Sequence, residues 1–276
     1  MPTAKVGDIN IYYESHGDGE ALLLIMGYGQ YSAHWSPLIP PLSQEYRVIS
    51  FDNRGTGRSD KLGIPYTIKM MADDAKGLLE AIGIDSAHVF GVSMGGMISQ
   101  EFALNHPNKL RSLILGCTQC GGTKAILANQ EALAFLFSPE MAKLPVEERA
   151  RETVPWLWTQ EFIDKNPEAV ELYVAVTSKY PTPTHGYACQ AQAIMGHDTY
   201  ERLPQIAVPT LVIAGSADRL IPAENSRILA SRIPNAELVI LENAGHGFVT
   251  DAGAEATKVM LDFLRRHSRG RKRPNL

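Results

Sequence analysis

The feature that most constrains this 276-residue chain is the segment 91–96, with the sequence GVSMGG. It follows a short apolar run at 87–90, typical of a buried strand, and precedes apolar residues at helical spacing over 97–104. A sharp strand-to-helix turn needs small residues two positions before and after a central serine, whose hydroxyl then stands exposed above a sheet. The pattern therefore predicts that Ser93 is a nucleophile carried on such a turn.

A serine hydroxyl is a weak nucleophile and needs a base that is itself oriented by an acid. In the chain order typical of this turn, the acid follows the serine and the base comes last. Asp218 follows an apolar run at 209–215 and is the predicted acid. Its alternative role is a turn aspartate that caps a helix starting near residue 222. His246 lies in a glycine-flanked loop after the strand pattern 237–241 and is the predicted base.

Acyl transfer builds negative charge on a carbonyl oxygen, and backbone N–H groups can stabilise that charge. Met94, the residue after the serine, is predicted to supply one such N–H. The loop after the strand near 21–25 is predicted to supply the other, from the N–H of Tyr28. The flanking Gly27 and Gly29 permit the unusual backbone that this requires.

With these landmarks the chain resembles enzymes of the α/β-hydrolase fold over nearly its whole length. The matching segments are 26–29 (MGYG), 51–59 (FDNRGTGRS), 91–96 (GVSMGG), 218–222 (DRLIP) and 245–247 (GHG). In detail the chain is similar to the branch of esterases and 3-oxoadipate enol-lactonase-like hydrolases, which includes lactonases acting on N-acyl homoserine lactones. Many members have His-Gly where this chain has Met26-Gly27. Because the oxyanion donor is a backbone group, we expect catalysis to survive this difference.

Strand and helix patterns alternate along most of the chain, which predicts an α/β fold with a mostly parallel twisted sheet covered by helices on both faces. Strands are expected near 21–25, 46–51, 87–91, 110–116, 209–215 and 236–241, helices near 34–44, 68–82, 94–105, 223–233 and 252–266, and an edge hairpin over 5–15. The alternation stops between 123 and 203, where helical patterns occur without a convincing strand. We therefore expect a core of residues 1–122 and 204–276 and an inserted helical cap of residues 123–203.

The cap is expected to cover the active site and to form part of the substrate pocket. Trp156 of the cap and Cys117, which follows the strand at 110–116, are the candidate pocket residues. An apolar pocket would favour an acyl or alkyl chain and exclude water during the reaction. Arg151 is one of few cap cations that could meet a substrate carboxylate.

Composition and the absence of certain segments narrow the classes of function that this chain can have. A net charge of −4 and a pI near 6.1 give no reason to expect nucleic-acid binding. The chain shows no apolar signal-peptide core and no run long enough to span a bilayer, so we expect a cytoplasmic protein without membrane insertion.

Cys117 and Cys120 match a C-x-x-C spacing, but further zinc ligands at suitable spacing are lacking, so no metal or cofactor is expected. The basic segment 265–273 is expected to be a solubilising tail.

The leading prediction is a cofactor-independent serine hydrolase of carboxylic esters or lactones, with Ser93, Asp218 and His246 as its triad. The expected partner is the small-molecule substrate, and homo-oligomer formation is left open. Three alternatives remain. The first is a lactonase specific for N-acyl homoserine lactones or enol-lactones. The second is a C–C bond hydrolase using the same triad, and the third is a non-catalytic small-molecule sensor on the same fold.

Overall fold

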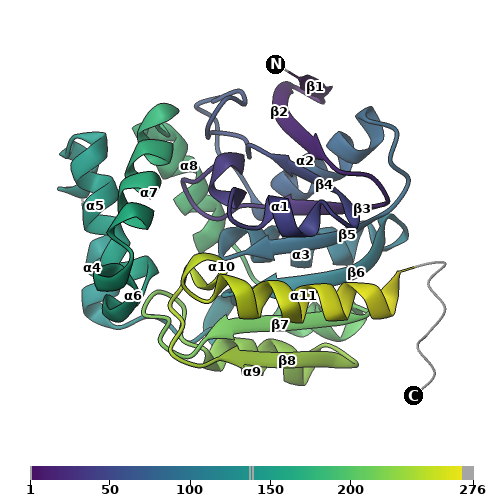
Figure 1. The fold of residues 1–276 in the computed structure, drawn as a ribbon. Coiled ribbons are helices and arrows are strands. Elements are labelled where there is room, and N and C mark those ends of the chain that lie inside the picture. The colour runs from purple at the N-terminus through teal and green to yellow at the C-terminus, as the bar shows by residue number, and fades with distance from the viewer. Residues whose placement is uncertain (1, 137, 139, 269–276) are drawn as a thin grey trace.

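The computed structural model describes residues 2–136, 138 and 140–268 (Figure 1). Within these residues the core is an eight-stranded sheet in the order β1-β2-β4-β3-β5-β6-β7-β8. The strands are β1 (Thr3–Val6), β2 (Ile9–His16), β3 (Glu20–Ile25), β4 (Tyr46–Phe51), β5 (Ala87–Val92), β6 (Leu110–Gly116), β7 (Thr210–Gly215) and β8 (Ala236–Leu241). Strands β3 to β8 pair in parallel, whereas β2 is antiparallel to both β1 and β4. The predicted mostly parallel sheet and its edge hairpin are confirmed.

Helices cover both faces of this sheet, as Figure 1 shows. The helices are α1 (Ile39–Leu42), α2 (Ile68–Ala81), α3 (Met94–Asn105), α4 (Gln130–Leu136), α5 (Val146–Leu157), α6 (Gln160–Lys165), α7 (Pro167–Lys179), α8 (Thr184–Met195), α9 (Glu224–Arg232), α10 (Phe248–Asp251) and α11 (Gly253–His267). Successive residues of β3 point to opposite faces. Leu23 and Ile25 pack in the core cluster shared with α2 and α3, and Leu22 and Leu24 pack in the cluster shared with α11. Burial on both faces explains why central strands such as β3 and β7 are largely apolar runs.

The prediction of one helix near 34–44 is wrong. The segment instead contains a 3₁₀ turn, Ser32–Trp35, and the single helical turn α1. Pro37, Pro40 and Pro41 lack the N–H donor that a continuous helix needs and fix their own φ angles, so the chain breaks into short pieces.

Residues 123–203, called the cap from here on, lie beside the sheet layers and carry α4 to α8 (Figure 1). The cap has its own small apolar cluster, in which Val154, Leu157 and Trp158 pack with Leu220 of the core. None of the helices in the described ranges combines the length and the apolar character needed to cross a bilayer. Most of the predicted basic tail lies outside the described residues, which end at Ser268.

Candidate active site

Ser93 occupies the turn between β5 and α3. Its φ of 55° and ψ of −124° lie in a region that non-glycine residues rarely adopt, a strain found where surrounding structure dictates the backbone. The neighbouring glycines make the turn possible. A Cβ on Gly91 would lie 2.1 Å from the carbonyl oxygen of Gly95, and a Cβ on Gly95 would lie 2.0 Å from that of Ile25. The Gly-x-Ser-x-Gly spacing is therefore a packing requirement of this turn.

His246 and Asp218 form a hydrogen-bonded pair on the loops after β8 and β7. The distance from His246 Nδ1 to Asp218 Oδ2 is 2.7 Å. The other carboxylate oxygen accepts the N–H groups of Leu220 and Ile221, each at 2.8 Å, which fixes the orientation of the carboxylate. Burial lowers the pKa of His246, but the negative charge of Asp218 and the nearby Cys117 side chain outweigh burial and raise the pKa well above 6.5. Asp218 thus orients the imidazole, and its negative charge stabilises the protonated form of His246.

Ser93 and His246 both line one cavity of about 420 Å³. The cavity lies at the carboxyl ends of the parallel strands, where ligands bind in sheets of this kind. Its opposite wall comes from the cap and includes Phe135, Leu157, Trp158, Tyr173, Tyr187 and Ala188. The cavity therefore lies between the core and the cap.

The predicted oxyanion donors, Tyr28 and Met94, lie on the loop after β3 and at the first position of α3. Neither backbone N–H donates to a backbone or side-chain acceptor in the described part of the chain. For Met94 this follows from its position, because the first N–H groups of a helix have no partner within the helix. Gly29 is different, because its N–H donates to Gln190 Oε1 at 2.9 Å and its carbonyl accepts from Thr182 Oγ1 at 2.8 Å. The loop is thus attached to the cap at Gly29, and the described residues leave the N–H of Tyr28 without an acceptor.

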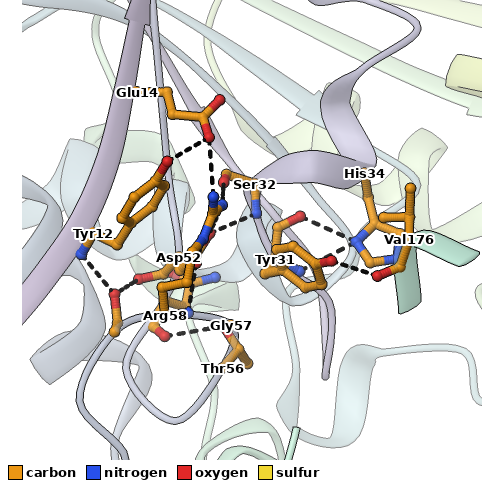
Figure 2. A network of polar contacts seen from close by, with 12 residues as sticks. Tyr12, Glu14, Tyr31, Ser32, His34, Asp52, Thr56, Gly57, Arg58 and Val176 are labelled. Carbon is orange, nitrogen blue, oxygen red and sulfur yellow. Dashed lines mark hydrogen bonds and ion pairs between the residues drawn. The ribbon is translucent and has the colours of Figure 1, made fainter. Parts of the chain in front are cut away.

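An ion pair between the buried Asp52 and the partly exposed Arg58 also holds this loop (Figure 2). The fully buried Asp52 accepts the Ser32 N–H at 2.9 Å and the Arg58 Nε–H at 3.0 Å. The adjacent Tyr31 donates its hydroxyl proton to the carbonyl of Val176 in α7. The loop that carries Tyr28 is therefore fixed to the core on one side and to the cap on the other.

The structure corrects one predicted pocket residue. Trp156 does not line the cavity: its ring stacks on Phe135, with 4.9 Å between ring centroids, and Arg219 lies 4.2 Å from the centre of its ring. Trp158, two residues further on, lines the cavity instead. Cys117 does lie on the cavity wall, directly after β6, with a φ of 39°.

Arg149 of α5 is a cavity residue that the sequence did not single out. Arg151, the cation considered from the sequence, instead pairs with Glu171 on the exposed surface at 2.6 Å. The Arg149 guanidinium carbon lies 5.2 Å from the ring centre of Tyr187, and no carboxylate of the described chain pairs with it. Since none of the described lining residues is an aspartate or glutamate, Arg149 gives the cavity an uncompensated positive charge.

Three tyrosines, Tyr28, Tyr173 and Tyr187, share this part of the cavity. Burial raises the pKa of Tyr28 and of Tyr173 to about 12, and it also raises the pKa of Tyr187. The positive charge of Arg149 opposes this rise for each of the three, as expected for a guanidinium close to all of them. Their hydroxyls therefore stay protonated and can donate hydrogen bonds beside the cation.

The doubly covered parallel sheet, the strained serine turn and the late histidine define the class of protein. A family model for the alpha/beta hydrolase fold matches residues 20–252. The chain belongs to this family of hydrolases.

Individual relatives give a finer comparison. The chain is 32% identical to the "Putative carbamate hydrolase RutD" of Caulobacter sp. strain K31, over 92% of this chain and 95% of that protein. It is similar to the crystal structure of the enol-lactonase from Burkholderia xenovorans LB400, with a TM-score of 0.85 and 27% identity over 95% of this chain and 99% of that one. It is also similar to Est816, described as an N-acyl homoserine lactone degrading enzyme, with a TM-score of 0.82 and 26% identity over 95% of this chain and all (100%) of that one.

Proposed function

We propose that the protein is a serine hydrolase that cleaves carboxylic esters or lactones through Ser93, His246 and Asp218. The observation that supports this most is the shared cavity: the strained Ser93 and His246 both line it, and Asp218 orients His246 at 2.7 Å. A nucleophile, an orienting acid and a base, in that order along the chain, are the requirements of acyl transfer on this fold.

The reaction proceeds through an acyl-enzyme. His246 takes the Ser93 proton as Oγ attacks the substrate carbonyl, and Asp218 stabilises the imidazolium that forms. The N–H groups of Tyr28 and Met94 donate to the oxyanion. His246 then protonates the leaving alkoxide and later activates the water that releases the acid. In a lactone the leaving alcohol is part of the acyl chain, so the acyl-enzyme carries it and the attack of water releases a single hydroxy acid.

The titration of His246 tests its role as the base. Only the neutral imidazole can accept the Ser93 proton, so kcat/KM is expected to rise with pH through the pKa of His246, at a midpoint above 6.5. Asp218→Asn removes the negative charge that raises this pKa, so the pKa is expected to fall. NMR titration of His246 in a Ser93→Ala background measures both values without turnover. A parent His246 that titrates at or below pH 6.5 contradicts the assignment.

Arg149 indicates which esters fit the cavity best. Arg149 has no carboxylate partner among the described residues, and the cavity around it is largely apolar. Such a positive charge is stabilised when a bound ligand supplies the negative charge. The neighbouring tyrosine hydroxyls add neutral donors for the same ligand group. We therefore favour substrates that carry a carboxylate away from the ester carbonyl.

Arg149→Gln is expected to lower kcat/KM for a carboxylate-bearing ester by about 10- to 100-fold, the cost of losing one hydrogen bond to a charged group. The measurement compares p-nitrophenyl butyrate with the p-nitrophenyl monoester of glutaric acid, which differs by a terminal carboxylate. Arg151→Gln is the matched control, because Arg151 lies on the same helix but pairs with Glu171 outside the cavity. Equal losses for the neutral and the charged ester would refute a specific role for Arg149.

Carbamate hydrolysis is the second candidate, favoured by the full-length similarity to proteins named carbamate hydrolase RutD. A p-nitrophenyl N-alkylcarbamate separates the two functions. An ester hydrolase is expected to release one equivalent of p-nitrophenol and then remain carbamoylated, whereas a carbamate hydrolase turns over many times.

The decisive experiment is a hydrolysis panel on the purified protein. It contains linear p-nitrophenyl esters, N-acyl homoserine lactones, an enol-lactone and the carbamate. Ser93-dependent turnover of esters or lactones supports the proposal, and the ratio between the two groups decides between esterase and lactonase. Labelling of Ser93 by a fluorophosphonate without any turnover across the panel would favour C–C cleavage or ligand sensing instead.

A further inference from the structure

Cys117, Asp218 and His246 bring three kinds of metal ligand together beside the cavity. The Cys117 Sγ, a carboxylate oxygen of Asp218 and a ring nitrogen of His246 all lie within 4.8 Å of one another, and all three residues are buried. Cys117 and His246 also line the cavity, which gives an ion a path to them. Thiolate, imidazole and carboxylate are the zinc ligands of proteins, and three of them leave a fourth tetrahedral position for water or substrate. We propose that this cluster binds Zn²⁺ and that the bound ion inhibits the enzyme.

The sheet topology explains why these three ligands lie far apart in the sequence and form no closely spaced metal-binding motif. The three residues follow β6, β7 and β8, which are neighbours in the sheet, so the carboxyl ends of these strands bring the side chains together. Donor atoms on one tetrahedral zinc ion stand roughly 3.3 to 3.7 Å apart, a spacing that follows from the bond lengths of zinc to sulfur, nitrogen and oxygen. The widest separation, at most 4.8 Å, therefore needs to close by only about 1 Å, whereas the 2.7 Å hydrogen bond between His246 Nδ1 and Asp218 Oδ2 must open where these two atoms are the ligands.

Zinc binding and catalysis compete for the same imidazole. Zinc needs a deprotonated thiol and a free imidazole lone pair, so the ion displaces protons from both side chains. In a zinc-bound neutral His246 the basic lone pair is bonded to the ion, so the imidazole cannot take the proton of Ser93. The inhibition thus rests on the proposed function, whereas the binding of zinc does not.

Calorimetry on the Ser93→Ala variant tests the binding without turnover. We expect one Zn²⁺ per chain, with affinity at least about tenfold weaker when Cys117→Ser is added, since loss of even an outer-shell partner costs that much. Cys189→Ser is the matched control, because this free cysteine lies on α8 and does not line the cavity. Mg²⁺, which prefers oxygen ligands, is expected not to bind. Co²⁺ in place of zinc should give a thiolate-to-metal absorption band that Cys117→Ser abolishes.

The outcomes separate this inference from the proposed function. Zinc binding that is unchanged by Cys117→Ser, or no binding to folded Ser93→Ala, overturns the zinc site whatever the enzyme hydrolyses. One-to-one binding that depends on Cys117 supports the site even if the substrate panel is silent. In the active enzyme, micromolar zinc should abolish turnover, and a chelator should restore it. Inhibition by zinc that persists unchanged in Cys117→Ser, measured relative to the variant's own uninhibited rate, also overturns the proposal.

Discussion

Replacing Ser93 with alanine is expected to lower kcat by at least about 10⁵-fold, because the residues of a catalytic triad act as a unit and the nucleophile is lost. The remaining oxyanion donors and binding contacts supply only a small residual rate. Alanine at this position keeps the Cβ that the strained turn already accommodates, so the fold should be unchanged. Steady-state hydrolysis of the best panel substrate measures the rate, and the far-UV circular dichroism spectrum with thermal unfolding checks the fold.

The matched control is Ser138→Ala. Ser138 is a cap serine that lines the same cavity but lies in a loop far along the chain from the strained turn. It should retain kcat within a few-fold of the parent. If Ser93→Ala keeps more than about one per cent of the parental kcat, a loss far smaller than nucleophile removal produces, the acyl-enzyme mechanism is wrong.

Gly95→Ala is expected to destabilise the protein by more than about 4 kcal/mol, or to prevent folding altogether. A Cβ at residue 95 would lie 2.0 Å from the backbone carbonyl oxygen of Ile25, and neither the helix start nor β3 can move away without losing core packing. Urea denaturation followed by circular dichroism gives the free energy of unfolding. Expression as insoluble protein is consistent with the same steric conflict.

Gly63→Ala provides the comparison, because a Cβ there meets no atom within 4 Å and Gly63 lies in an exposed loop. Its free energy of unfolding should stay within about 0.5 kcal/mol of the parent. A Gly95→Ala protein that unfolds at the parental urea concentration would show that the strand-to-helix turn can relax, and the packing explanation of the glycine spacing would fail.

Much of the sheet could be predicted because the central strands, such as β3 and β7, are apolar runs bounded by glycine, proline or a polar turn. Apolar spacing alone predicts one helix near 34–44. Three prolines in that segment remove backbone N–H donors, so the structure has only short helical turns there. The proximity of Asp218 and His246 was also predictable. Both follow parallel strands, and the carboxyl ends of parallel strands meet at one edge.

The sequence could not predict which side chains of the cap helices face the cavity. Arg149 and Arg151 are two residues apart on α5, and each residue of a helix turns by about 100°, so the two side chains leave the helix in nearly opposite directions. One enters the cavity and the other pairs with Glu171 on the surface. The same ambiguity explains the choice of Trp156 over Trp158, since both are large, apolar and close to the end of α5.

The sequence by itself determined the local features: the strands, the glycines that permit the turn at Ser93, and the order in which serine, aspartate and histidine follow one another. These depend on backbone preference and on contacts between near neighbours, which a pattern of residue types records. Only the tertiary structure decided which cap side chains face the cavity, that Arg149 enters it without a carboxylate partner among the described residues, and that Cys117 lies beside Asp218 and His246. Those facts depend on how whole helices and strands are rotated and packed against one another, and many rotations are compatible with the same pattern of apolar and polar residues.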